Sequence, residues 1–81
     1  MLSPVVSIVT LHHRGDFIYK FVESAKKQTI HCEIIVMTSN DELASKGIKD
    51  CIVMYHPGMP AAKRNAGVRL ARCEHIGFFD D

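Results

Sequence analysis

The sequence predicts an α/β fold with an open, parallel, Rossmann-like sheet. Short apolar runs alternate along the chain with segments of helical periodicity, in the order βαβαβαβ. The apolar runs are nearly continuous, which is typical of strands covered on both faces of a sheet. Strands separated by helices pair in parallel through right-handed crossovers. We expect the strand order 3-2-1-4, so that the order reverses between the first and fourth strands.

The first half of the chain supplies two strands and the first helix. Val5–Thr10 is apolar and β-branched, and Glu33–Thr38 repeats that pattern, so both segments are predicted as buried strands. Between them, Asp16 can cap a helix that runs to about Gln28. The apolar stripe of this helix follows the 3.6-residue period and consists of Phe17, Ile18, Phe21, Val22 and Ala25.

The second half continues the alternation. Ser39–Glu42 starts a short helix that Gly47 ends, and Cys51–Tyr55 is the third strand. Pro60 can open a helix that runs to about Arg72, and His75–Phe79 is the last strand. Nothing follows the apolar last strand to cover it, and we therefore expect a natural domain that continues, with residues 1–81 as its incomplete N-terminal part.

Composition excludes several classes of protein. With 81 residues, 47% of them hydrophobic and 23% charged, the chain is one domain at most and is not disordered. Its apolar runs are strand-sized, too short to span a bilayer, and no basic segment leads into a secretory signal. The net charge of +1 gives no reason to expect nucleic acid as a partner.

The cysteines indicate the compartment. Cys32, Cys51 and Cys73 are odd in number and widely spaced, and no CxxC pair occurs, so neither zinc nor a redox dithiol is indicated. We expect reduced packing residues and a cytoplasmic protein.

The topology locates a candidate site. Ligands of open α/β sheets bind outside the carboxyl ends of the strands, where the strand order reverses. Leu11–Arg14 and Asp80–Asp81 follow the first and fourth strands and should lie at that point. The GxGxxG and GxxxxGK[ST] phosphate loops are both absent, which argues against dinucleotide-binding and P-loop proteins.

Four segments in order, VSIVT, EIIVMTSND, GMPAAKRNAGVRLA and HIGFFDD, resemble the start of a family 2 glycosyltransferase of GT-A fold. Gln28, Lys63–Gly67 and Phe78–Asp81 match positions of that pattern. The resemblance implies a hexosyltransferase-like enzyme that moves a sugar from a nucleotide-diphosphate donor, with a UDP-sugar expected. This chain would supply the donor-binding half and be inactive alone, since no general base is present. The resemblance also allows peripheral membrane association of the full-length protein.

Asp80 and Asp81 take the first and middle positions of the DxD motif by this resemblance. They would contact the nucleotide-sugar, and Asp81 would approach a metal ion, Mn²⁺ or Mg²⁺ in the complete enzyme. Such hard cations prefer oxygen ligands and neutralise a leaving diphosphate. The alternative is a solvated acidic end of the chain.

Arg64 is a candidate for the same ligand. Pro60, Arg64, Val68 and Ala71 fall on one side of their helix at about 100° per residue, so we place Arg64 facing the sheet. A cation near the start of a helix is disfavoured by the helix dipole unless an anion offsets it. That anion would be a bound phosphate or a carboxylate such as Asp80.

The loop after the first strand would lie against the base and ribose. Leu11 and His13 are its candidate contacts, with His13 standing where the family usually has tyrosine. A metal pair of His12 and His13, or a plain surface loop, are the alternatives, and consecutive residues seldom converge on one ion.

The segment after the second strand departs from the family. Thr38 and Ser39 stand where two acidic residues are usual, one of which reads a uracil N–H. Ser39 can accept that hydrogen bond, but without charge it is weaker. Asn40 and Asp41 would then act only as a helix cap. A non-catalytic nucleotide-binding or scaffold module remains the alternative function.

Overall fold

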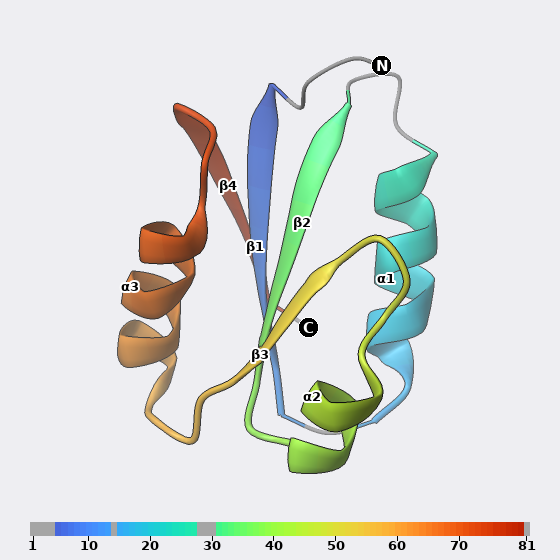
Figure 1. Ribbon diagram of the computed structural model, residues 1–81, viewed down its shortest axis with the longest axis vertical. Coiled ribbons are helices and arrows are strands. Elements are labelled where there is room, and N and C mark those ends of the chain that lie inside the picture. Colours follow the sequence, from blue (N-terminus) through green and yellow to red (C-terminus); the bar gives the residue numbers. More distant parts are fainter. Residues whose placement is uncertain (1–4, 14, 28–30, 81) are drawn as a thin grey trace.

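The computed structural model describes residues 5–13, 15–27 and 31–80 (Figure 1). Its four strands are parallel and lie in the order β3-β2-β1-β4. Their bounds are β1 Val6–His12, β2 Cys32–Thr38, β3 Ile52–Tyr55 and β4 His75–Asp80. The predicted fold class and strand order are confirmed, and β1 runs two residues further than its apolar pattern indicated.

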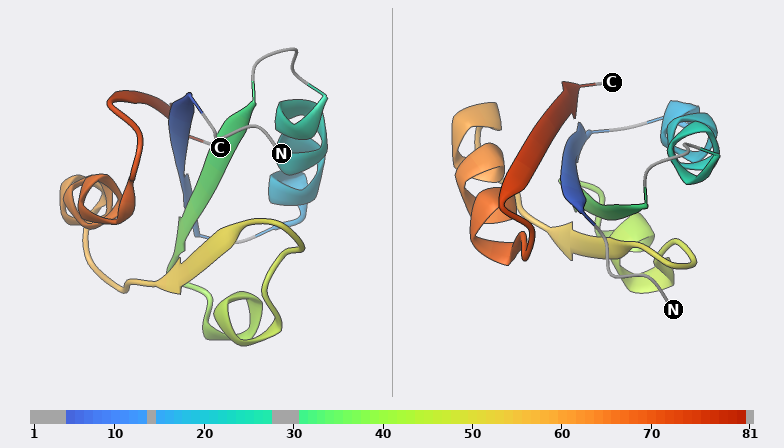
Figure 2. Two further views of the ribbon diagram at one scale, coloured as in Figure 1. Left: turned by 45° about the horizontal axis from the view of Figure 1, so that its top comes forward. Right: turned by 90° about the horizontal axis from the view of Figure 1, so that it is seen from above.

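Three helices cover the two faces of the sheet, and Figure 2 shows them on opposite sides of it. Helix α1, Phe17–Lys26, and helix α2, Asp41–Lys46, lie on one face, and α3, Pro60–Leu70, lies on the other. Helix α3 packs on β1 and β2. Because each helix follows a strand and returns antiparallel to it, α3 begins at the edge where the strands end.

Alternate residues of β1 and β2 build two separate cores, as strand geometry requires. Towards α1 and α2 the buried side chains are Ile8, Ile18, Val22, Ala25, Ile34, Val36 and Leu43. Towards α3 they are Val9, Leu11, Ile35 and Met37, with Ala66 and Leu70 packed against them. The nearly continuous apolar pattern of the strands is thus explained by burial on both faces.

Helix α3 turns a different side to the sheet from the one predicted. Its buried residues are Lys63 and Gly67, whereas Val68 is 39% exposed and Pro60 is exposed. A Cβ atom at Gly67 would lie 2.5 Å from Cγ1 of Val9, so the helix backbone rests directly on β1. The placement of Pro60 and Val68 on the inward side was wrong, because the helix rotates to put its glycine at the closest approach.

The ends of α2 agree with the sequence. The Asn40 side chain accepts a hydrogen bond from the Leu43 amide at 3.1 Å, and Gly47 ends the helix with a φ of 73°. A positive φ is readily adopted by glycine. Asp16 stands at the start of α1 as predicted, but its side chain makes no capping hydrogen bond.

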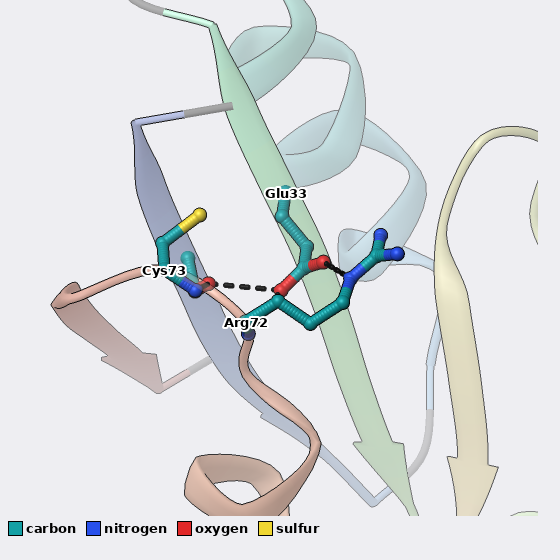
Figure 3. A network of polar contacts seen from close by, with 4 residues as sticks. Glu33, Arg72 and Cys73 are labelled. Carbon is teal, nitrogen blue, oxygen red and sulfur yellow. Dashed lines mark hydrogen bonds and ion pairs between the residues drawn. The ribbon is translucent and has the colours of Figure 1, made fainter. Parts of the chain in front are cut away.

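A charged cluster lies at the amino end of the sheet, where Ser7 of β1 pairs with Glu33 of β2. Figure 3 shows Glu33 beside Arg72 and Cys73. The Glu33 carboxylate accepts hydrogen bonds from the Ser7 hydroxyl at 2.9 Å, the Arg72 amide at 3.0 Å and the Arg72 Nε at 2.6 Å. The Ser7 hydroxyl in turn accepts from the Cys73 amide at 3.2 Å. We call Ser7, Glu33, Arg72 and Cys73 the Glu33 clasp.

The Glu33 clasp keeps its carboxylate charged although the side chain is only 4% exposed. Burial works against ionisation, but the hydrogen bonds from Arg72 and Ser7 outweigh it, and the pKa of the Glu33 carboxyl is lowered. The clasp therefore ties β1 and β2 to the turn between α3 and β4. Cys32, Cys51 and Cys73 are all half-buried, which agrees with their prediction as packing residues.

Candidate functional site

The carboxyl ends of the strands meet at one edge of the sheet. In the register, His12 lies beside Thr38, Thr38 beside Tyr55, and Leu11 beside Asp80. The segments predicted to hold the ligand are therefore neighbours in space. This edge is where an open parallel sheet binds its ligands.

The first polar pair at this edge is buried and faces α1 and α2. His12 is 2% exposed and Thr38 is 0% exposed, and His12 Nδ1 lies 2.7 Å from the Thr38 hydroxyl. The other ring nitrogen lies 3.0 Å from the carbonyl oxygen of Gly15. A carbonyl oxygen can only accept, so Nε2 donates to Gly15.

The Thr38 hydroxyl also accepts a hydrogen bond, from the Asn40 amide at 2.9 Å. Hydrogen bonds thus connect Asn40, Thr38, His12 and Gly15 without a break. Thr38, at the position where an acidic residue was expected to read the base, has its hydroxyl occupied within the protein.

The second polar pair lies one residue past the end of each strand, on the opposite face of the sheet by strand alternation. His13 is exposed, and its Nδ1 lies 2.8 Å from the Ser39 hydroxyl. The Ser39 amide donates to the His12 carbonyl at 3.0 Å, which extends the pairing of the two strands. Two candidate residues from separate segments are thus brought together, with both polar groups near the surface.

The other candidate residues differ in burial and in position. The Leu11 side chain is 8% exposed in the core beneath α3, and Arg64 is half-buried on α3. The backbone of Asp80 ends β4 beside Leu11. Asp81 lies outside the described residues, as do Arg14 and Gln28.

The expected metal site depends on residues beyond this description. Within residues 5–13, 15–27 and 31–80, no three histidine, cysteine or acidic side chains gather to hold a metal ion. The described residues alone do not fit a metal centre, and the contribution of Asp81 stays a prediction.

A polar cavity of about 210 Å³ lies next to the buried pair, between α1 and α2. His12, Asp16, Asn40, Glu42 and Lys46 are among its lining residues. It is smaller than the roughly 300–1,000 Å³ typical of cavities for organic ligands. A whole nucleotide would therefore not fit inside this cavity.

Sequence reasoning missed the buried pair. Adjacent histidines suggested a loop or a metal pair, whereas His12 is the last residue of β1 and points away from His13. The signal that could have found it is the period of two along a strand, carried two residues past the apolar run.

Comparison with protein-family models decides the family. The model described as glycosyl transferase family 2 matches residues 7–81. The chain belongs to glycosyl transferase family 2. Searches of curated proteins and of solved structures returned no match. Helices long and apolar enough to cross a membrane are absent from the described part of the chain.

Membership of glycosyl transferase family 2 gives the sheet edge its general chemistry. The family transfers glycosyl groups, in general from nucleotide-sugar donors. The edge formed by His13, Ser39 and the end of β4 is therefore the candidate donor site of this family 2 chain.

Proposed function

We propose that this chain binds the nucleotide of a nucleotide-diphosphate sugar, with UDP as the nucleotide, in a hexosyltransferase. The observation that carries the proposal is the pair of His13 and Ser39 at the carboxyl edge of the sheet, next to the point between β1 and β4 where the strand order reverses. An imidazole ring can pack on a base, and a serine hydroxyl can accept or donate at its edge.

The rest of the edge supports the same arrangement. Asp80 ends β4 beside Leu11 of β1, directly across the reversal from the pair of His13 and Ser39. A carboxylate there can accept hydrogen bonds from ribose hydroxyls or approach the diphosphate through a cation. Base contacts at the ends of β1 and β2 and sugar-phosphate contacts at the end of β4 would order the donor across the edge.

The chemistry asked of these residues is binding and orientation. Glycosyl transfer needs the acceptor oxygen, the anomeric carbon and the leaving diphosphate to be aligned. Holding the base and ribose rigidly fixes the position of the leaving group. Activation of the acceptor hydroxyl belongs to a general base that no residue of this chain is assigned.

The test is a calorimetric titration of UDP with Mn²⁺ into the protein and into its Asp80→Ala variant. We expect Asp80→Ala to weaken UDP binding by about tenfold or more, because it removes a charged hydrogen-bond partner. Glu74→Ala is the matched control, since it removes one exposed carboxylate ahead of β4. Equal binding by the protein and Asp80→Ala would contradict the proposal.

The second candidate function is a non-catalytic scaffold module. The observation in its favour is the neutral, fully occupied hydroxyl of Thr38 at a base-reading position. A scaffold would bind no nucleotide in the same titration, whereas a donor-binding module would.

A further inference from the structure

Lys63 is a buried cation with no role in the donor site proposed above. It is 6% exposed and lies on the inward face of α3, one turn before Gly67. Gly67 packs against Val9 and Met37 of the central strands. One turn towards the start of α3 therefore brings Lys63 to the carboxyl ends of β1 and β2.

The ammonium group of Lys63 has no hydrogen bond or ion pair with the described residues. Among those residues, no fully buried side-chain nitrogen lacks a hydrogen-bond partner. The ammonium of Lys63 must then keep contact with solvent while its aliphatic stem is buried. Because side chains of a helix lean towards its amino end, that contact opens at the edge of the sheet.

The first turn of α3 adds further donors at the same edge. Met59 precedes the helix without a capping hydrogen bond from its side chain, and Pro60 has no amide proton. The amides of Ala61 and Ala62 therefore have neither a helical acceptor nor a side-chain cap. No acidic residue stands in this turn. Free amides, the positive end of the helix dipole and a lysine together favour an anion.

We infer that Lys63 and the amino end of α3 bind a phosphate group of the nucleotide donor. This inference rests on the proposed function, because that function supplies the diphosphate. The buried stem of Lys63 limits the positions of its ammonium, so little side-chain entropy is lost when phosphate binds. The alternative is a lysine whose stem only fills space beneath α3.

The test compares uridine, UDP and inorganic pyrophosphate in the presence of EDTA, so that only protein groups hold the phosphates. The variant Lys63→Met keeps the length of the stem and removes the charge. Lys20→Met is the matched control, because it removes the same charge from an exposed position on α1. Calorimetry gives the dissociation constants, and thermal unfolding checks that each variant folds.

We expect Lys63→Met to weaken UDP binding by about tenfold and to leave uridine binding unchanged. Lys20→Met should bind both as the unaltered protein does. Equal UDP binding by Lys63→Met and the unaltered protein would overturn the inference and leave the proposed function standing. Failure of the unaltered protein to bind UDP would refute the proposed function, and pyrophosphate binding that depends on Lys63 would still support the phosphate site.

A second variant separates binding from folding. Met59 is 76% exposed, so Met59→Asp removes little packing and places a carboxylate over the free amides. We expect its unfolding temperature to rise and its UDP binding to fall about tenfold, with Met59→Ala close to the unaltered protein. Unchanged UDP binding by a stabilised Met59→Asp would show that the helix end takes no part.

Discussion

The two ends of the sheet are held together by different chemistry. At the amino end, the Glu33 clasp uses a buried carboxylate with three hydrogen bonds and an arginine. At the carboxyl end, two pairs that contain no carboxylate join the ends of β1 and β2, His12 with Thr38 and His13 with Ser39. In the clasp, Ser7 and Arg72 both bond to Glu33, whereas the two pairs at the carboxyl end share no side-chain hydrogen bond.

This difference separates stability from ligand binding. A buried charge must keep all its partners, since losing one leaves an expensive unpaired group. The amino end is therefore poorly suited to rearrange. The carboxyl end has one fully occupied pair beneath and one exposed pair above, so a ligand can exchange with the bond of His13 and Ser39 at small cost. The following substitutions test this division, from the largest expected effect to the smallest.

Glu33→Ala should have the largest effect, because it removes the acid at the centre of the clasp. Ser7 and the Arg72 amide lose their acceptor, and we expect a loss of about 2–3 kcal/mol in the free energy of unfolding. Urea denaturation measures it. Glu23→Ala, which breaks an exposed pair with Lys27, should cost less than about 0.5 kcal/mol. Equal losses in the two variants would mean that the clasp stabilises the fold no more than an exposed ion pair does.

Thr38→Val keeps the shape of the side chain and removes the hydroxyl from the buried pair. His12 and the Asn40 amide both lose a partner, and we expect a loss of about 1–2 kcal/mol in urea denaturation. The control is Asn40→Ala, which removes only the cap of α2 at about 1 kcal/mol. No loss in Thr38→Val would show that the carboxyl end does not depend on this pair.

Acid should weaken the amino end through the clasp. The folded pKa of Glu33 is lowered, so its contribution is complete above the unfolded pKa and is lost as pH falls through the folded pKa. Unfolding free energies measured from pH 7 to pH 3 should therefore fall more steeply in the unaltered protein than in Glu33→Gln. Parallel curves for the two proteins would contradict the assignment of the charge to Glu33.

Ser39→Ala should change stability least. It breaks one exposed hydrogen bond with His13, and we expect less than about 0.5 kcal/mol in urea denaturation. Its effect should appear instead as weaker UDP binding in calorimetry, with Ser45→Ala on the exposed side of α2 as control. A large loss of stability with unchanged binding would reverse the proposed roles of the two ends.

The sequence predicted what depends on pattern and topology. Alternating apolar runs predicted a parallel α/β sheet, its expected order 3-2-1-4 is confirmed, and Asn40 and Gly47 marked the ends of α2 correctly. The meeting of the His13 and Ser39 segments at one edge followed from parallel strands. These features depend on local residue preferences or on the order of the elements along the chain, and both can be read from the sequence.

Features that depend on register or on how a helix rotates were not predicted. The inward side of α3 contains Lys63, a residue type that is usually exposed, so its apolar stripe is weak. Pairing of His12 with Thr38 requires knowledge of which residues of two strands lie side by side. Glu33 at the start of a strand gave no sign that a distant arginine would allow its burial.

The unbroken hydrogen bonds around His12 have a mechanical consequence. Asn40 begins α2, and Gly15 lies in the loop before α1, and the Thr38 hydroxyl and the imidazole join them without a gap. The start of α2 and the loop after β1 are therefore coupled as one stiff rim above the sheet. We expect a ligand that displaces either segment to disturb the other, and amide hydrogen exchange at Asn40, whose N–H bonds to Thr38, should report it.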